Sequence, residues 1–318
     1  RYLSYCEKIN NGKLITFFEI TTAAAFKAFQ DHPADFLILE VGLGGRFDAT
    51  NIIKSKKYTA ITPISIDHQD YLGNTLTQIA FEKMGILNNK SINFVNKQKP
   101  AVMNYIKSEL IRRKINASFY NQEWSIKSNF YVAKKMKINL SNLNLIGYHQ
   151  KTNAGLAIHI SRYLLKNNFK INTTKDALSK CEWAGRLQLI SQGKLLKHIH
   201  KYKKIYLDGF HNIDGMKVLI KSLEKNRKIL ICSFLNNKKY HFMLNKLSNY
   251  FNKIIVVKMN EENSIDKNDI PKNLSILFSP SLKQSFTLIN KYSSVKTSVY
   301  FGGSLYFIGE VLKINKSK

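Results

Sequence analysis

Short β-branched, apolar runs alternate with helical patterns along this chain, and the alternation constrains its fold more than any other feature. The runs DFLILEV (35–41), YTAITPISI (58–66) and SINFV (91–95) are predicted strands, because they are short and rich in β-branched or aromatic residues. Helical patterns follow at 75–87 and 98–113. Strands that alternate with helices favour β-α-β units and a parallel sheet. We predict an α/β fold with a doubly wound, mostly parallel sheet.

The last third of the chain repeats this pattern. IYLDGF (205–210), KILICSF (228–234) and KIIVVKM (253–259) are again short β-branched runs separated by helical segments. They predict a second, smaller α/β unit.

A chain of 318 residues is longer than one hydrophobic core usually supports, so two domains are expected. A helix that continues to about residue 166 precedes the polar, interrupted stretch 167–183, which we interpret as a linker. We place one domain at 1–180 and the other at 181–318.

The formal net charge of +29 is the strongest compositional signal. Such a charge is typical of proteins that bind nucleic acid or other polyanions. However, only seven of the 50 basic residues are Arg, and the lysines are spread over the whole chain. This distribution favours a solvated, lysine-rich surface over a dedicated nucleic-acid face, so we expect no specific nucleic-acid partner. Anionic small substrates would still be attracted.

Hydropathy and cysteine content exclude several other classes of protein. The mean hydropathy is −0.25, and no apolar run approaches the roughly 18 residues of a membrane span, so no membrane partner is expected. Cys6, Cys181 and Cys232 show no paired spacing. A disulfide framework or zinc site is therefore not expected, and a reducing cytoplasm fits best. No signal-peptide pattern follows Arg1.

Two predicted strands end in side chains that could hold a metal ion. Glu40 closes the run at 35–41, and Asp67 with His68 follows the run at 58–66. Ligands of open α/β sheets bind beyond the carboxyl ends of strands. Mg²⁺ takes few protein ligands, so a carboxylate and an imidazole from neighbouring strand ends would suit it. A polar cap on the sheet is the alternative interpretation.

The stretch EVGLGGRFDATN (40–51) places Gly42, Gly44 and Gly45 beside the carboxylate of Glu40. A surface turn does not need so many glycines. The pattern indicates that some group comes close to the backbone there.

Six segments, in chain order, resemble the folylpolyglutamate synthase/dihydrofolate synthase family within the Mur ligase superfamily. These segments are EVGLGGRFDATN, DHQDYLGNTLTQIAFEKMGI, GYHQKTNAG, WAGRLQLI, LDGFHNIDG and GGSLYFIGEVL. The first two together are the most specific, and the match covers nearly the whole chain.

This resemblance implies an ATP-dependent ligase of folate metabolism and one-carbon metabolism. The family phosphorylates the carboxylate of dihydropteroate or a folate with ATP, and the amine of L-glutamate then displaces the phosphate. Such a reaction depends on alignment and on neutralisation of charge on the phosphoryl oxygens. The implied partners are ATP, L-glutamate and dihydropteroate or tetrahydrofolate with its polyglutamates. Mg²⁺ is the implied cofactor, and a monomer is expected.

The resemblance also assigns residues to the catalytic and metal site. Glu40 and His68 match magnesium ligands. Lys83 matches a lysine that CO₂ converts into a carbamate facing the metal. His211 is implied in the catalytic cleft or in holding glutamate. An ordinary exposed lysine is the alternative for Lys83.

For the pterin, the family places contacts at Thr16 and Phe18 and at Phe47, Asp48 and Ala49. An aromatic ring can stack on a flat heterocycle, and the Asp48 carboxylate would accept from pterin N–H groups. Gly44 and Gly45 would then let the substrate lie against the backbone.

For the nucleotide, the family implicates Asn153, Arg186 and Asp208. The planar fork of an arginine binds two phosphate oxygens at once, and a carboxylate can accept from a ribose hydroxyl. Asn153 could instead be an ordinary residue at the start of a helix.

Four departures from the family pattern are visible, one of them Phe210 in place of a usual small residue. No glycine-rich phosphate loop of the GTNGKGS kind occurs, and NNGKLIT (10–16) lacks its spaced glycines. We therefore expect that a preceding segment is missing and that these residues alone are inactive. Ala184 replaces a usual proline, and the loop at 237–239 lacks two usual acids. The alternatives are another amide ligase of the Mur superfamily, or a degenerate, non-catalytic polyanion-binding module.

Overall fold

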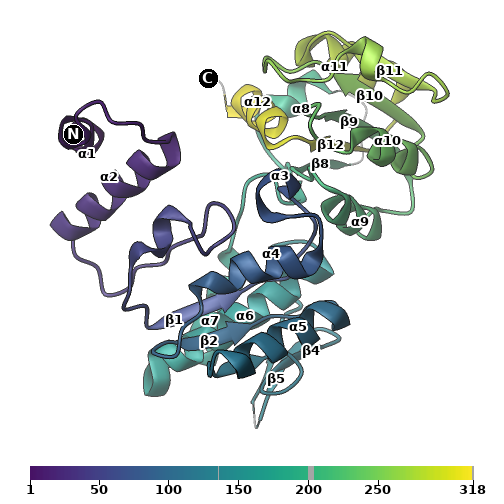
Figure 1. Ribbon diagram of the computed structural model, residues 1–318. Helices are drawn as coiled ribbons and strands as arrows, with labels where there is room; N and C mark the ends of the chain where they lie inside the picture. The colour runs from purple at the N-terminus through teal and green to yellow at the C-terminus, as the bar shows by residue number, and fades with distance from the viewer. Residues whose placement is uncertain (135, 200–203, 317–318) are drawn as a thin grey trace. The chain divides into compact units, whose positions relative to one another are not determined.

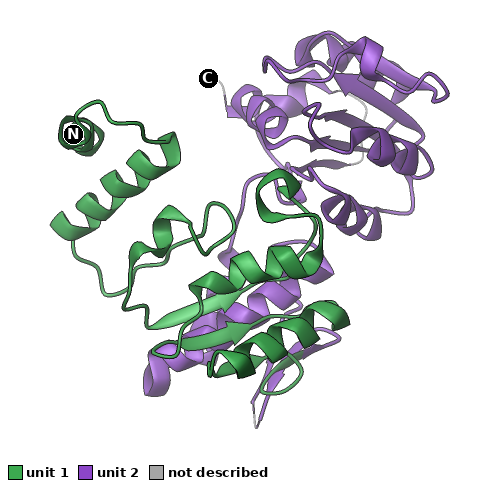
Figure 2. Ribbon diagram, viewed as in Figure 1, with its two compact units in different colours: residues 1–125 green, residues 126–318 purple. Residues whose placement is uncertain are grey.

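The computed structural model describes residues 1–134, 136–199 and 204–316. The chain divides into two compact units, Arg1–Ser125 and Ile126–Lys318, which Figure 2 shows in different colours. The predicted functional boundary near residue 180 stays a prediction. Within the described residues, no helix has the length and apolar character needed to cross a membrane.

Unit 1 begins with two helices, α1 (Tyr2–Asn10) and α2 (Phe17–Asp31), which pack against each other. Thr16 starts α2 through a capping box: its side chain accepts from the backbone N–H of Glu19, and the Glu19 carboxylate accepts from the backbone N–H of Thr16. Ala24 is the one buried residue of α2. These helices therefore add little to the core of the unit.

The core of unit 1 is a parallel three-stranded sheet covered by helices (Figure 1). Its strands are β1 (Tyr58–Ile61), β2 (Ile92–Val95) and β3 (Ala117–Phe119) in that order. Buried side chains from β1 and β2 pack against those of three helices. The remaining elements are α3 (Gln69–Leu72), α4 (Leu76–Lys83), α5 (Pro100–Arg112) and the 3-10 turns η1 (Ala49–Ile52) and η2 (Met84–Ile86).

Unit 2 opens with a small three-stranded sheet followed by helices. The sheet contains β4 (Ser125–Lys127), β5 (Phe130–Ala133) and β6 (Met136–Asn139), with β5 antiparallel to β6. The helical segments that follow are α6 (Tyr148–Leu165), η3 (Lys166–Asn168) and α7 (Ile171–Lys180).

A six-stranded sheet in the order β11-β10-β9-β12-β8-β7 forms the rest of unit 2, and only β7 is antiparallel to its neighbour. One core lies between the sheet and α8, α11 and α12, and a second lies on the side of α9 and α10 (Figure 1). The sheet is therefore doubly wound. The sequence predicted a doubly wound sheet for the first part of the chain and a smaller α/β unit for this part, but among the described sheets the larger one lies here. Its strands are β7 (Gln188–Leu189), β8 (Lys204–Asp208), β9 (Arg227–Ser233), β10 (Lys253–Val257), β11 (Ile276–Ser279) and β12 (Thr297–Gly303). Its helical segments are α8 (Leu195–His198), α9 (Ile213–Lys221), α10 (Tyr240–Ser248), η4 (Lys267–Asp269), α11 (Leu282–Tyr292) and α12 (Leu305–Lys316).

Two sequence-based predictions were wrong. Residues 35–41 form no strand, because a strand needs a ladder partner and the described residues provide none for this run. Most of its side chains are accordingly exposed, with Ile38 at 93%. The stretch 167–183 is not a simple linker, because Ile171–Lys180 forms α7.

Candidate functional site

The glycine-rich loop at 40–48 packs against the C-terminal end of α4. Gly44 has φ +67° and Gly45 has φ +154°. A Cβ on Gly45 would lie 3.0 Å from the carbonyl oxygens of both Glu82 and Lys83. The Arg46 N–H also donates to the Glu82 carbonyl oxygen (2.8 Å). Gly45 is therefore needed because this loop approaches the backbone of α4, whereas Gly44 has a left-handed φ and a Cβ there would lie 2.9 Å from the Leu72 side chain. Both reasons differ from the close approach of a substrate that we expected.

An ion pair locks the loop to the same helix. The Arg46 guanidinium donates two hydrogen bonds to the Glu82 carboxylate, at 2.7 and 3.1 Å. The Arg46 Cζ atom also lies 4.1 Å from the ring centroid of Phe47 and 5.0 Å from that of Phe81. Phe47 is 82% exposed, so one face of its ring is free to receive a flat ligand.

Asp48 is buried, and its carboxylate binds groups of its own loop. One oxygen accepts from the backbone N–H of Leu43 (2.8 Å), and the other accepts from the backbone N–H (2.9 Å) and hydroxyl (2.5 Å) of Thr50. An ionised carboxylate offers about four lone-pair sites. Three of them hold the loop, so about one is left for a ligand.

The structure brings Phe18 to this loop. A Cβ on Gly42 would lie 2.3 Å from the end of the Phe18 ring, so the ring lies directly over the Gly42 backbone. Helix α2 also contacts η1, which starts at Ala49. Thr16 caps α2, and its hydroxyl donates to the Glu19 carboxylate (2.6 Å). Of the five predicted pterin residues, Phe47 and Asp48 lie in the loop, Ala49 starts η1, and the Phe18 ring lies on the loop. The fifth, Thr16, caps the helix that carries Phe18.

Lys83 is the last residue of α4 and is partly buried. Burial lowers the pKa of its ammonium, while the negative charges of Asp67 and Asp48 partly oppose that shift. A lowered pKa increases the fraction of neutral amine, which is the form that reacts with CO₂. The direction of this shift is the one that the carbamate prediction needs, and the carbamate itself stays a prediction.

The predicted metal ligands Glu40 and His68 are both exposed. His68 precedes α3 in the left-handed conformation (φ 50°, ψ 42°), and its backbone N–H donates to the Asp67 carboxylate (2.9 Å). Within the residues that the structure describes, no group of three or more His, Cys, Asp or Glu side chains could hold a metal ion. The role of Glu40 and His68 stays a prediction.

In unit 2, Asp208 lies at the C-terminal end of β8, as the sequence predicted. Burial raises the pKa of its carboxyl to about 6, although the Arg186 charge, the backbone N–H groups of Leu187 and Phe210, and His211 all oppose the shift. The His211 Nδ1 lies 3.1 Å from the Gly209 carbonyl oxygen. Asp208, Arg186 and His211 thus form one polar cluster at a strand end.

Asn153 is exposed in the second turn of α6, where its amide lies 3.4 Å from the Gln150 side-chain oxygen. Sequence reasoning missed His149, which stands four residues earlier and hence on the same helix face. Its Nδ1 is buried and has no hydrogen-bond partner in the described structure. Burial and the Arg186 charge lower the pKa of His149.

Comparisons with known proteins agree with the fold. Residues 4–161 match the Mur ligase middle domain. E. coli FolC in complex with DHPP and ADP superposes with a TM-score of 0.83 at 22% identity, covering 98% of this chain and 74% of that chain. A bifunctional folylpolyglutamate synthase/dihydrofolate synthase with Mn, AMPPNP and L-glutamate bound gives a TM-score of 0.82 at 20% identity, with 98% and 74% covered. The chain therefore has the Mur ligase fold.

The particular family follows from a curated relative. The dihydrofolate synthase/folylpolyglutamate synthase of Bacillus subtilis (strain 168) is 30% identical over 319 residues, which cover 94% of this chain and 72% of the relative. This chain belongs to the dihydrofolate synthase/folylpolyglutamate synthase family, whose members are ATP-dependent ligases.

Proposed function

We propose that this protein joins L-glutamate to dihydropteroate, to tetrahydrofolate and its polyglutamates, or to both, with ATP as co-substrate. Membership of the family supports this activity, and the names of the relatives describe the same two ligations. The observation that carries the proposal is the packing of the GGRFDATN loop on the end of α4 that holds Lys83. This packing places the loop that carries predicted pterin contacts beside Lys83, the residue predicted to be carbamylated.

The proposed reaction proceeds through an acyl phosphate. A carboxylate oxygen of the pteroate or folate attacks the γ-phosphorus of ATP, and the bond between that phosphorus and the ADP oxygen breaks. The neutral amine of glutamate then attacks the carbonyl carbon, and the bond to the phosphate oxygen breaks. An amide, inorganic phosphate and one proton are the products. Exclusion of water protects the acyl phosphate from hydrolysis.

The residues around Lys83 fit a divalent cation such as Mg²⁺. Carbamylation would turn the Lys83 ammonium into an anion that faces Asp67 and Asp48. The charges of these two carboxylates already act on Lys83. Three anions so close would repel one another unless a cation lay among them. Carboxylate and carbamate oxygens are the donors that Mg²⁺ prefers, and we propose the Lys83 carbamate, Glu40 and His68 as its ligands. When bound, the ion would neutralise charge on the transferred phosphoryl group.

We assign the nucleotide to Asn153, Arg186 and Asp208. Arg186 would bind phosphate oxygens with its planar fork, and the Asp208 carboxylate would accept from a ribose hydroxyl. The two side chains already share one polar cluster. The raised pKa of Asp208 means that this acceptor is lost below about pH 6, so nucleotide binding should weaken there.

We assign the pterin to Phe18, Phe47, Asp48 and Ala49, with Thr16 holding the helix that carries Phe18. The exposed Phe47 ring is the stacking surface, and the remaining lone pair of Asp48 is the acceptor for a ring N–H. We propose that His211 helps to hold glutamate, and that residues 181–318 act as the domain that brings this substrate. The enzyme is proposed to act as a monomer in the cytoplasm.

An isotope-transfer experiment tests the proposal. The protein, in the full length in which its cell makes it, is incubated with ATP, Mg²⁺, glutamate and dihydropteroate labelled with ¹⁸O in its carboxylate. Mass spectrometry should find one labelled oxygen in the released phosphate for each amide formed. Amide formation without label in the phosphate would disprove the acyl phosphate, and absence of amide formation would disprove the ligase.

A further inference from the structure

The N-terminal edge of the six-stranded sheet in unit 2 concentrates positive charge. Because β8 to β12 are parallel, the segments leading into them meet at this edge, and Asp208 lies at the opposite one. Cationic side chains stand in or beside the first residues of four neighbouring strands, which spread them over about 14 Å at roughly 4.8 Å per strand. We call these residues the basic edge: Lys253, Lys225, Arg227, Lys228, Lys296 and Lys204.

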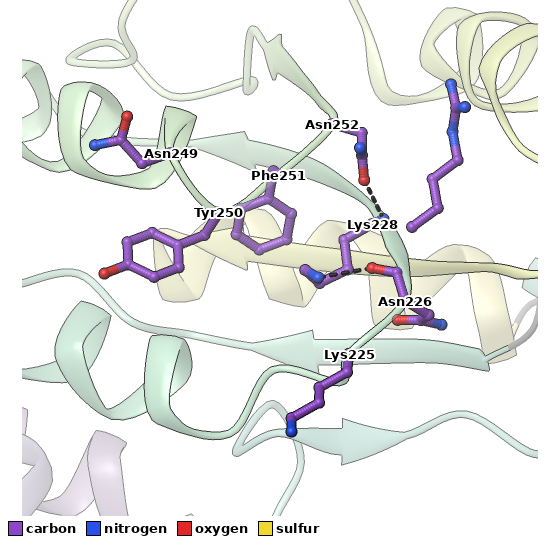
Figure 3. A pocket seen from close by; sticks show the side chains of 8 residues that line it. Lys225, Asn226, Lys228, Asn249, Tyr250, Phe251 and Asn252 are labelled. Carbon is purple, nitrogen blue, oxygen red and sulfur yellow. Dashed lines mark hydrogen bonds between the residues drawn. The ribbon is translucent and has the colours of Figure 1, made fainter.

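A pocket of about 540 Å³ lies on the basic edge (Figure 3). Its walls come from the connection before β9 and the connection before β10, at 225–228 and 249–252. Three of the eight lining residues are cationic, three are asparagines, and the other two are Tyr250 and Phe251. No lining residue is acidic. The pocket therefore suits an anion that also accepts and donates hydrogen bonds.

Glu224 is the one acidic residue in the described segments that lead into these four strands, and its charge is already used. Its carboxylate lies 2.5 Å from the Lys204 ammonium and accepts from the hydroxyls of Tyr206 (3.0 Å) and Ser298 (2.8 Å). Lys225 and Arg227 are exposed, and neither has an ion pair or side-chain hydrogen bond within the described structure. Their charges are available to a ligand.

Lys228 is held in place at the pocket. Its ammonium donates to the carbonyl oxygens of Glu224 (3.0 Å) and Asn226 (2.7 Å). Its backbone N–H donates to the Asn252 side chain (2.8 Å), the contact drawn beside Asn252 in Figure 3. One of the three pocket cations is thus already held in place, so a ligand would order only the side chains of Lys225 and Arg227 on binding.

We propose that the basic edge binds the phosphodiester backbone of single-stranded nucleic acid, as a second activity that is independent of the ligase reaction. Phosphates spaced along a strand match cations spaced along a row of β-strands. Tyr250 is 39% exposed beside the pocket, so its ring can stack on a base. An acidic peptide would use the cations but gain nothing from this ring. Binding would be indifferent to base sequence. The proposal departs from our expectation of a solvated, lysine-rich surface without a dedicated nucleic-acid face.

Fluorescence anisotropy with labelled single-stranded polyuridylate tests this assignment. An RNA of about 20 nucleotides exceeds the roughly 4–16 nucleotides that one domain usually covers. The test variant is Lys225→Gln/Arg227→Gln. The matched control is Lys267→Gln/Lys283→Gln, which removes the same charge from exposed residues that lie away from the basic edge. Both pairs are exposed, so folding should be unchanged, and thermal unfolding checks this.

The test variant should lose affinity about tenfold at moderate salt, and the slope of log affinity against log salt should fall by about 1.4, or roughly 0.7 for each lost phosphate contact. The control should change affinity less than about twofold. Equal losses in both variants would show that only net charge matters and would overturn the assignment. Undetectable RNA binding, or equally strong binding of polyglutamate or of anionic vesicles, would also overturn it. Because ligation is assayed separately, these outcomes do not depend on the proposed function.

Discussion

Acid should destabilise unit 2 through one buried histidine, His159 of α6. The side chain is 2% exposed, and its Nδ1 lies 2.9 Å from the Tyr131 hydroxyl oxygen. Arg162 also donates to that hydroxyl (3.2 Å). Burial, and secondarily the Arg162 charge, lower the pKa of His159 from 6.5 to about 4. This histidine therefore stays neutral in the folded protein under conditions that protonate it in the unfolded chain.

The sign and size of the effect follow from this difference. Between the two pKa values the unfolded state binds more protons, so stability is full above about pH 6.5 and falls as pH decreases toward 4. The free energy of unfolding should decrease by about 2 kcal/mol between about pH 7 and pH 5 because of this residue alone. Urea unfolding, followed by circular dichroism at both pH values, measures the loss.

Comparison with His159→Gln isolates the contribution. The amide can still hydrogen-bond to Tyr131 but does not titrate, so the variant should lose about 2 kcal/mol less than the wild type over the same pH interval. A matched change at an exposed histidine, His241→Gln, should leave the pH dependence as it is. If His159→Gln and the wild type show the same pH dependence, the reasoning from burial is refuted.

Four further outcomes are expected. Asp48→Ala should cost about 3 kcal/mol of unfolding free energy, because two backbone donors lose their acceptor; unchanged stability in urea would show that the carboxylate serves only a ligand. Gly303→Ala should cost at least about 2 kcal/mol, since φ is +98° and the new Cβ would lie 2.0 Å from the Ser233 carbonyl oxygen; unaltered thermal unfolding would contradict this. Asp208→Asn should weaken ADP binding about tenfold in calorimetry, a loss of about 1.4 kcal/mol. The variant should also lack the decrease in ADP affinity that we expect of the wild type below about pH 6. An unchanged affinity would remove Asp208 from the nucleotide site. Lys83→Ala should abolish ligation, and removal of CO₂ should slow the wild type. Full activity of the wild type without CO₂ would exclude the carbamate.

Much of the fold was predictable because strands and helices leave local patterns. The buried strands β9 and β10 read as continuous β-branched runs, and the structure confirmed both. The run at 35–41 has the same local pattern but forms no strand. Strand pairing is a property of two segments, and the sequence of one segment does not show whether its partner is present. The short strands at 125–139 were missed because their polar residues give no clear period.

The candidate site divides in the same way. That Asp208 ends a strand followed from the apolar run before it, and that Lys83 lies on a helix followed from the pattern at 75–87. The reason for Gly45 could not be predicted, because it depends on the end of α4, nearly forty residues away, and the reason for Gly44 depends partly on Leu72 of α3. The hydrogen bonds of Asp48 were likewise hidden, although an Asp two residues before a Thr is a common turn-forming pattern.

The most direct test of the central claim is the product that the protein makes. The protein in its natural full length is incubated with ATP, Mg²⁺ and L-glutamate, together with dihydropteroate, tetrahydrofolate or a cell-wall precursor of the kind that other Mur ligases use. Mass spectrometry identifies the product, and a coupled assay counts ADP. We predict a dihydropteroate or folate that is one glutamyl residue heavier, with one ADP for each new amide. Extension of the cell-wall precursor, with no glutamate added to either pterin substrate, would contradict the account.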